Sequence, residues 1–440
     1  MNSKKNRFIS LLLVMVMLMT TLTACGEKKK NTSNTSTGVS GDQVELRFSW
    51  WGGDSRHEKT LKVIELFEEK HPNIKIKAEY AGWDGYQEKQ TTQIAGGTEA
   101  DIMQVNWNWL TQYSADGSGF YDLNEVKDIL KLENYDEDML ELVTQNGVLN
   151  AMPVAKTGKV FYWNKTTFDK AGVEIPTNFD ELKVVAEDMK EKLGDNFYPF
   201  ASIGPYSTFL LTLYIAEQET GKTFIENNEV AYTEKELSQA LKDCMSLVKT
   251  GISPSVEETA GGGNVSADQM PAWIEGRYAG IYEWDSTINK YESALAEGQE
   301  LVVGEYLTGF GTHDAALTKL SMAFAISKNT KYPEEAATFI NFLLSDPEAV
   351  KIMETDRGIP VNKEAIKTLE DEGLLTGIAY EGNKLAFEHK GKDISPYFED
   401  TQLKKSYEET LDQLGYGKIN EDEAAKQIIE VVNNKLESVK

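Results

Sequence analysis

The feature that most constrains the fold is a regular exchange of two hydropathy periods along the chain. Residues 44–48 and 74–80 alternate apolar and polar side chains, as strands do. A helical pattern separates them, and a second helix predicted at about 85–95 leads into the apolar run 102–105. Strands that alternate with helices of about ten or more residues form parallel sheets. The pattern therefore predicts an α/β fold built on a parallel sheet.

The same alternation returns in the second part of the chain. Hydrophobic spacing predicts long helices, two short strands, and late helices that open at prolines. These elements are 179–193, 234–249, 278–282, 321–326, 333–344 and 420–435, and another helix opens at Asp346-Pro347. The longest irregular stretch, 253–269, is predicted to be a surface loop. A chain of 440 residues with this pattern suits two domains better than one.

Residues 1–24 are predicted to be a targeting segment. Basic residues precede the apolar stretch 8–19, which is too short to span a bilayer. The stretch leads into Leu22-Thr23-Ala24-Cys25, which resembles the lipobox of bacterial lipoproteins. The resemblance implies that Cys25 becomes the lipidated first residue of the mature protein, with a plain secretory signal as the alternative. Residues 25–43 are predicted to be a flexible tether, so we expect a lipid-anchored protein on the extracytoplasmic face of the cell membrane.

Composition and missing motifs narrow the function. The chain has 71 acidic against 45 basic residues and a net charge of −26, which argues against nucleic acid and against binding anionic lipid through a basic patch. Cys244 lies in a predicted amphipathic helix and is expected to be a buried, inert thiol. The histidines show no metal-ligand spacing, and neither a phosphate-binding glycine loop nor a G-x-S-x-G motif occurs. We therefore expect no metal, no cofactor and no enzyme activity.

Aromatic and polar side chains gather just after the predicted strands, where α/β sheets bind ligands. These residues are Trp50, Trp51, Trp83, Asp84, Tyr86, Asn106, Trp107, Asn108, Trp109, Glu283, Trp284 and Asp285. An indole ring packs against the apolar face of a sugar ring, whereas Asn and Asp side chains bond to its hydroxyl groups. A core position is the alternative for any single tryptophan. As a set, these residues predict a sugar-binding site.

Short motifs follow one another in a fixed order from residue 44 to the end of the chain. They are Phe48-Ser49-Trp50-Trp51-Gly52, then 93–103, 119–123, 161–165 with 170–172, 273–276 with 280–282, 335–343 and 357–360. In this order the chain resembles the family 1 extracellular solute-binding proteins of ABC transporters. The resemblance implies the type II fold of periplasmic binding proteins, with two lobes, a hinge and an interlobe ligand cleft. Lobe 1 would comprise 44–155 and 320–356, and lobe 2 would comprise 156–319 and 357–440.

The resemblance also points to a ligand class. The stretches 50–57, 82–85, 106–109 and 395–398 are similar to those of oligogalacturonide-binding members. A uronate needs a cation in the cleft, and Arg56, Lys159 and Lys319 are candidates, with solvated surface charges as the alternative. Together with the cleft residues that the resemblance implies, the predicted ligand-binding set is Trp51, Arg56, Trp83, Asn106, Trp107, Lys159, Trp284, Asp285, Lys319 and Tyr397. Because Glu283 and Asp285 would repel a polyanion, a neutral sugar stays open.

The sequence thus predicts a monomeric, lipid-anchored extracellular binding protein. It would capture an oligosaccharide, such as a pectin-derived oligogalacturonide, and deliver it to the permease subunits of an ABC importer. The membrane would be contacted through the lipid anchor only. The alternatives are a lipid-anchored glycan hydrolase or lyase, a receptor for a neutral plant oligosaccharide, and a receptor for a non-sugar solute such as a peptide or polyamine.

Overall fold

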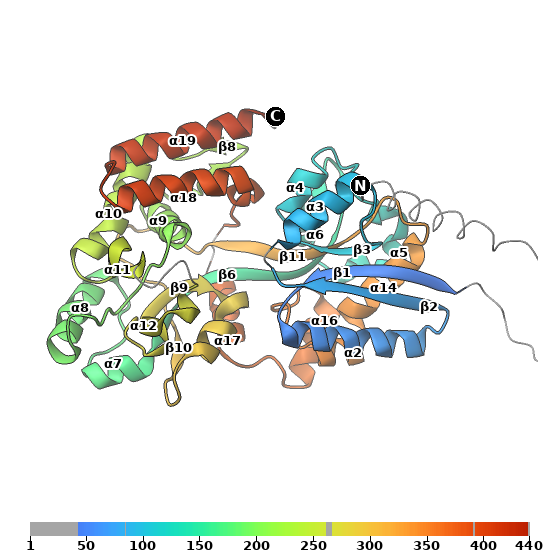
Figure 1. Cartoon of the computed structure of the whole chain (residues 1–440), viewed down its shortest axis with the longest axis horizontal. Coiled ribbons are helices and arrows are strands. Elements are labelled where there is room, and N and C mark those ends of the chain that lie inside the picture. The colour runs from blue at the N-terminus through green and yellow to red at the C-terminus, as the bar shows by residue number, and fades with distance from the viewer. Residues whose placement is uncertain (1–42, 84, 261–265, 390–391, 439–440) are drawn as a thin grey trace, which may run out of the picture. The chain divides into compact units, whose positions relative to one another are not determined.

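The computed structural model describes residues 43–83, 85–260, 266–389 and 392–438 (Figure 1). The predicted targeting segment and Cys25 lie outside the described residues. Across the part of the chain that is described, no helix has both the length and the apolar composition needed to cross a membrane.

A seven-stranded sheet holds the two parts of the chain together. Its path runs β10-β6-β11-β3-β1-β2, and β9 also pairs with β6. The strands are β1 (Val44–Trp51), β2 (Ile74–Ala81), β3 (Ile102–Val105), β6 (Met152–Asn164), β9 (Gly280–Trp284), β10 (Leu301–Gly304) and β11 (Thr318–Ile326). β1 is parallel to β2 and β3, whereas β9, β10 and β11 are antiparallel to their partners. The sheet is therefore mixed, and the expected parallel sheet is right only for β1 to β3.

Two strands, β6 and β11, run through both halves of this sheet (Figure 1). Residues 152–158 of β6 pair with β11, and residues 159–164 pair with β9 and β10. The far end of β11 pairs with β3. The register between β11 and β6 shifts between Leu320 and Ala323, and such irregularities bend a strand. Because the strands cross in opposite directions, they account for the antiparallel centre of the sheet.

The helices form two sets, one beside β1 to β3 and one beside β9 and β10 (Figure 1). The first set is α2 (Asp54–Lys70), α3 (Tyr86–Gly96), α4 (Trp109–Tyr113), α5 (Lys127–Leu130), α6 (Glu137–Glu141), α14 (Pro333–Ser345), α15 (Pro347–Met353) and α16 (Lys363–Asp371), with the 3₁₀ turns η1 (Leu123–Val126) and η2 (Leu132–Asn134) and the hairpin β4 (Thr144–Gln145) to β5 (Val148–Leu149). The second set is α7 (Lys165–Ala171), α8 (Phe179–Leu193), α9 (Pro205–Thr220), α10 (Glu234–Lys249), α11 (Val256–Ala260), α12 (Pro271–Ile274), α13 (Ile288–Ala294), α17 (Ile378–Glu388), α18 (Thr401–Gly415) and α19 (Glu421–Ser438), with η3 (Ala267–Gln269), η4 (Asp285–Thr287), η5 (Pro396–Glu399) and the hairpin β7 (Ile225–Glu226) to β8 (Glu229–Val230).

This architecture matches the α/β, two-lobe expectation, with one difference at a predicted boundary. Residue 357 was expected to begin the last part of lobe 2. However, α16 packs against α14 and α15, and its buried Ala365 and Leu369 cluster with Val350. The chain thus stays with the first set of helices through α16 and joins the second set at α17, which packs on β6. The remaining lobe boundaries stay predictions.

The predicted surface loop at 253–269 is wrong in part, because it contains α11 and η3. The reason is a local capping arrangement at Ser255 and Glu258. The Ser255 backbone N–H donates to the Glu258 carboxylate (2.8 Å), and the Glu258 N–H donates to the Ser255 hydroxyl (3.2 Å). Ser with Glu three residues later is a sequence signature of a helix N-terminus, so the signal was present in the chain.

Trp163 of β6 explains two glycines in the neighbouring strands. A Cβ atom on Gly304 would lie 1.9 Å from Trp163 Nε1, and one on Gly280 would lie 2.3 Å from the same indole ring. The strands on both edges of β6 therefore approach a large buried ring at positions that only glycine fits. This packing fixes β9 and β10 against β6, and β9 ends at Trp284.

Two titratable groups are buried in the second set of helices. The Cys244 thiol is a free cysteine whose pKa is raised to about 12 by burial, so the prediction of an inert thiol is confirmed. Glu217 of α9 is also buried, and its Oε2 has no hydrogen-bond partner among the described residues. Burial raises the pKa of Glu217 to about 8, although the Lys392 cation acts in the opposite direction.

We expect Glu217→Gln to make the stability of the protein less dependent on pH. A carboxyl group with a raised folded-state pKa stabilises the fold below its unfolded pKa of about 4.3, and that contribution is lost as pH rises through about 8. Because Gln resembles the protonated acid, the variant should nearly match the wild type at pH 4 and exceed it by at least about 1 kcal/mol at pH 9. Urea unfolding at both pH values measures this difference. Glu187→Gln, on the exposed face of α8, is the control, and equal curves for Glu217→Gln and wild type at pH 9 would contradict the prediction.

Candidate functional site

The structure brings three predicted site residues together at the end of β9. Lys159 of β6 is the register partner of Trp284. The Lys319 ammonium lies 4.5 Å from the centre of the Trp284 ring, and the Lys159 ammonium lies 5.6 Å from it. Lysine ammonium groups at such distances are attracted by the ring electrons. One tryptophan and two cations thus form the centre of the candidate site.

Lys159 is a buried cation with fixed partners. Its side chain is 1% exposed, and its Nζ donates to the carbonyl oxygen of Tyr282 (2.8 Å) and lies 3.8 Å from Glu283 Oε1. Burial lowers the pKa of Lys159, and the Glu283 charge opposes this shift while Lys319 adds to it. Lys159 therefore places positive charge beside the site from within the sheet.

Glu399 at the end of η5 collects polar partners from several elements. Its carboxylate forms an ion pair with Lys319 and accepts a hydrogen bond from the Tyr206 hydroxyl (2.8 Å). Asn106 Nδ2 lies 3.5 Å from Glu399 Oε2, and Asn108 Nδ2 donates to the Glu399 carbonyl oxygen (2.9 Å). Burial alone would raise the pKa of Glu399, but Lys319 and Tyr206 hold it below its ordinary value. Glu399 therefore stays ionised and links the residues after β3 to the second set of elements.

A cavity of about 430 Å³ lies next to this cluster. It is lined by Lys159, Phe200, Ala201, Ser202, Ile203, Gly204, Tyr206, Ser207, Ser266, Ala267, Ile281, Tyr282, Glu283, Thr287, Lys290, Tyr291 and Lys404. Three lysines against one glutamate give the lining a positive balance, in a chain whose net charge is −26. Aromatic rings, hydroxyl groups and cations together suit a sugar that carries negative charge.

The surroundings of Asp285 differ from the prediction, because its carboxylate already accepts hydrogen bonds from three groups of the protein. Thr157 donates to Oδ1 (2.5 Å), while the Gly158 N–H (3.0 Å) and Asn383 Nδ2 (2.8 Å) donate to Oδ2. Burial raises the pKa of Asp285 to about 6, against the effect of these donors. The side chain therefore ties β6 to α17, and its predicted contact with a ligand stays a prediction.

Several predicted aromatic residues form a separate cluster after β1 and β2. Trp83 is 52% exposed and stacks on Trp109 at 5.7 Å. Trp51 is buried and lies 5.3 Å from both of these rings, and Tyr86 packs against it. The cluster does not line the cavity described above. It presents one indole ring to solvent, beside the Asn108 that reaches Glu399.

The other predicted residues occupy three different environments. Asn106 and Trp107 follow β3, and the Trp107 indole is buried with no hydrogen-bond partner for Nε1 among the described residues. Arg56 of α2 donates to the Asp356 carbonyl oxygen (2.8 Å), so its predicted role as a ligand cation competes with a structural one. Tyr397 is half-buried in η5. Their contacts with a ligand stay predictions.

Four residues of this region were missed by the sequence analysis, namely Tyr206, Lys290, Glu399 and Lys404. Tyr206, Glu399 and Lys404 come from helices or turns that are distant from the strand ends along the chain, whereas Lys290 lies in α13, six residues after the end of β9. Only Glu399 had a local signal, because it directly follows the similar stretch 395–398. Side chains brought in by tertiary packing carry no such local mark.

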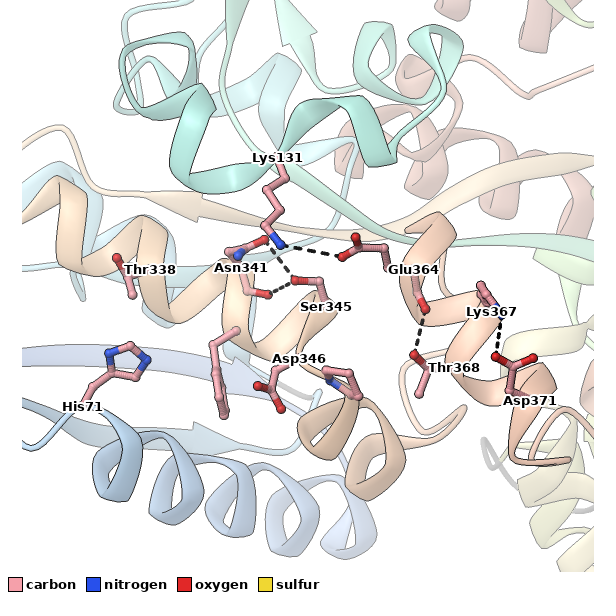
Figure 2. Close-up of a pocket in the computed structure, with 12 residues that line it drawn as sticks. His71, Lys131, Thr338, Asn341, Ser345, Asp346, Glu364, Lys367, Thr368 and Asp371 are labelled. Atoms are coloured by element: carbon pink, nitrogen blue, oxygen red, sulfur yellow. Dashed lines mark hydrogen bonds and ion pairs between the residues drawn. The ribbon is translucent and has the colours of Figure 1, made fainter.

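A second cavity of about 510 Å³ lies among α14, α15 and α16 (Figure 2). None of the predicted site residues lines it, and its lining contains no tryptophan. Figure 2 shows Lys131 directed toward Glu364, and Lys367 toward Asp371. The cations of this cavity are paired with carboxylates of α16. Because the cavity lacks the predicted residues and any tryptophan, the cluster around Trp284 is the better candidate site.

Comparisons with known proteins find similarity over most of the chain. A family model for the bacterial extracellular solute-binding proteins matches residues 62–375. The chain is 37% identical to a periplasmic oligogalacturonide-binding protein of Yersinia enterocolitica, solved with saturated digalacturonic acid, over 90% of this chain and 100% of that one, with a TM-score of 0.83.

Two further relatives are similar over different lengths. A periplasmic solute-binding protein of Pectobacterium atrosepticum is 37% identical over 90% of this chain and 100% of its own, with a TM-score of 0.85. The xylose/arabinose-binding protein of Haloferax volcanii is 25% identical over 275 residues, which are 58% of each chain.

We expect Asp285→Ala to destabilise the protein. The change leaves the donors at Thr157, Gly158 and Asn383 without their acceptor in a buried place, so the free energy of unfolding should fall by roughly 2–4 kcal/mol. Urea unfolding at pH 7 measures the loss. Asp169→Ala, an exposed side chain of α7, is the control and should change the stability little. A variant of wild-type stability would show that Asp285 does not hold β6 to α17.

Proposed function

Because the chain belongs to the family of bacterial extracellular solute-binding proteins, we propose that it captures an oligosaccharide with uronate groups and delivers it to an ABC importer. The observation that best supports an acidic ligand is the cluster of Lys159, Lys319 and Trp284, next to a cavity with three lysines in its lining. The Yersinia relative, which was solved with digalacturonic acid, supports the same class.

The cavity lining supports each part of this ligand. The rings of Tyr206, Tyr282 and Tyr291 provide apolar faces for sugar rings. Ser202, Ser207 and Thr287 provide hydroxyl groups that can donate to or accept from sugar hydroxyls. Lys404 can form a charge-assisted hydrogen bond with a uronate, and so can Lys290 in addition to its ion pair with Asp268 (3.1 Å). Glu283 is the lining group that would repel a uronate, and its Oε2 accepts from Tyr291 (3.1 Å).

Transport would couple ligand capture to closure of the two lobes. β6 and β11 are the strands shared by both halves of the sheet, so a change in their bend would move one set of helices against the other. The importer would recognise the closed form. The protein performs no chemistry in this scheme, and it differs from a hydrolase or lyase in leaving the oligosaccharide intact.

Isothermal titration with oligogalacturonides and with neutral xylo-, manno- and galacto-oligosaccharides tests the ligand class. We expect heat from galacturonides only, and weaker binding at high salt because ion pairs are screened over about 10 Å at ordinary ionic strength. The oligosaccharides should be recovered at their original length. Tight, salt-independent binding of a neutral oligosaccharide with no heat from galacturonides would reject the acidic ligand. Shortened chains would reject the receptor in favour of an enzyme.

Lys404→Gln and Lys405→Gln form a matched pair of variants for the cavity. Lys404 lines it with its ammonium 4.3 Å from the Tyr206 ring, whereas Lys405 is the exposed neighbour on the same helix. Loss of one partly exposed charge-assisted bond should weaken galacturonide binding by about 3- to 10-fold in Lys404→Gln only. Equal affinities for the two variants, measured by the same titration, would remove Lys404 from the site.

We also propose that Cys25 anchors the protein to the membrane through lipid. The residue lies outside the described part of the chain, so the proposal rests on the lipobox resemblance. In cell fractionation we expect the Cys25→Ala variant to be released from the membrane fraction. Its affinity for the sugar should stay the same as that of the wild type. A variant that stays membrane-bound after washing would contradict the lipid anchor.

A further inference from the structure

We propose that Glu399 is a built-in surrogate for the ligand carboxylate, which holds the empty cleft closed and must be displaced when an acidic sugar binds. The inference rests on the proposed acidic ligand and deepens it, because it names the group that a uronate has to replace.

The groups that surround the Glu399 carboxylate are those that would bind a ligand carboxylate. Glu399 contacts an ammonium (Lys319), a phenol hydroxyl (Tyr206) and a side-chain amide (Asn106). A cation combined with neutral hydrogen-bond donors is the environment that a sugar carboxylate needs. The Lys319 ammonium also lies 4.5 Å from the centre of the Trp284 ring, so a carboxylate in the place of Glu399 would lie near this indole. Glu399 therefore occupies a site with the chemistry of a uronate pocket.

Of the two lysines beside Trp284, Lys319 is the one that an anionic ligand can reach more easily. Lys159 is 1% exposed and is committed to the Tyr282 carbonyl oxygen. Lys319 is 12% exposed, and Glu399, with 9% of its side chain exposed, is its ion-pair partner. A ligand carboxylate that bonds to Lys319 would therefore have to take the place of Glu399. Without displacement of Glu399, the ligand would place a second carboxylate against the first, which is unfavourable at short range.

Glu399 also bridges the two sets of elements. Asn106 and Asn108 follow β3, whereas Tyr206 belongs to α9 and Glu399 to η5. Burial of the Glu399 carboxylate is tolerable because its partners come from both sides and keep it ionised. A uronate in its place could contact Lys319 and Tyr206 on one side and Asn106 on the other, so the ligand would close the cleft by the contacts that Glu399 makes without it.

This arrangement has a measurable consequence for affinity. A protein that is mostly latched shut exposes its binding-competent form only in part, and the apparent affinity falls by that fraction. If the latched form holds about nine-tenths of the ligand-free protein, the apparent affinity is about tenfold weaker than the intrinsic one. The latch therefore lowers the apparent affinity for the ligand.

The test uses Glu399→Gln, with Asn108→Ala as a second variant and Asp393→Asn as the control. Glu399→Gln keeps the shape and removes the charge that binds Lys319. Asn108→Ala removes the contact with the Glu399 carbonyl oxygen without changing any charge. Asp393 also pairs with a lysine of the crossing strands, Lys156 (3.2 Å), and accepts from Thr318 (2.6 Å), but these partners belong to β6 and β11 and not to the residues after β3. Thermal melts first confirm that each variant is folded.

Two readouts separate the surrogate from the proposed function. In small-angle X-ray scattering without ligand, Glu399→Gln and Asn108→Ala should have a larger radius of gyration than wild type and Asp393→Asn. In titration with digalacturonate, Glu399→Gln should bind about tenfold more tightly than wild type and depend more strongly on salt, because Lys319 is then free.

Wild type that binds digalacturonate together with Glu399→Gln that binds equally or more weakly would overturn the surrogate role. Scattering curves of Glu399→Gln and Asn108→Ala that coincide with wild type would overturn the latch, whatever the ligand. A wild type silent to every galacturonide would instead reject the proposed ligand, and with it the surrogate role. The scattering result would then still decide whether Glu399 holds the cleft closed.

Discussion

The structure depends most on one constraint, the shared use of β6 by both halves of the sheet. The first part of this strand pairs with β11, and the second part pairs with β9 and β10. That second part places Lys159 opposite Trp284 and fits Trp163 between two glycines. A shift of β6 by one residue would turn each of these side chains to the other face. The same pairing that joins the halves therefore also fixes the candidate site.

Charges are buried around this strand, and each has a compensating partner. Asp285 accepts from two residues of β6 and one of α17, and Lys159 donates to a backbone carbonyl and faces Glu283. Buried ions contribute little net stability, but breaking one side of such a pair is destabilising. The arrangement therefore specifies one geometry for the crossing strands more than it strengthens the fold. A receptor that bends at these strands needs such specificity, because the two halves must return to the same relative register after each cycle.

The sequence predicted the elements that local patterns determine, and it missed the features that depend on contacts between distant segments. Helices 179–193 and 234–249 coincide with α8 and α10, because their apolar stripes and caps lie within the segments themselves. The strand ends that carry Trp51, Asn106 and Trp284 were also found, since strand periodicity marks them. The antiparallel course of β11 and the place of α16 depend on contacts between distant segments, which no local pattern records. Glu399, Tyr206 and Lys404 were missed for the same reason.

The acidic chain and the proposed acidic ligand are compatible because the two charges act at different distances. The net charge of −26 repels an anion from afar, but this field is screened beyond about 10 Å at ordinary ionic strength. Within that distance the proposed ligand would meet the lysines of the cavity, where low solvent access strengthens each contact. The surface charge would then slow the approach, and the local lysines would determine the affinity. The same separation explains why global composition could exclude nucleic acid, which needs an extended basic surface, and yet left the sign of a small enclosed ligand undecided.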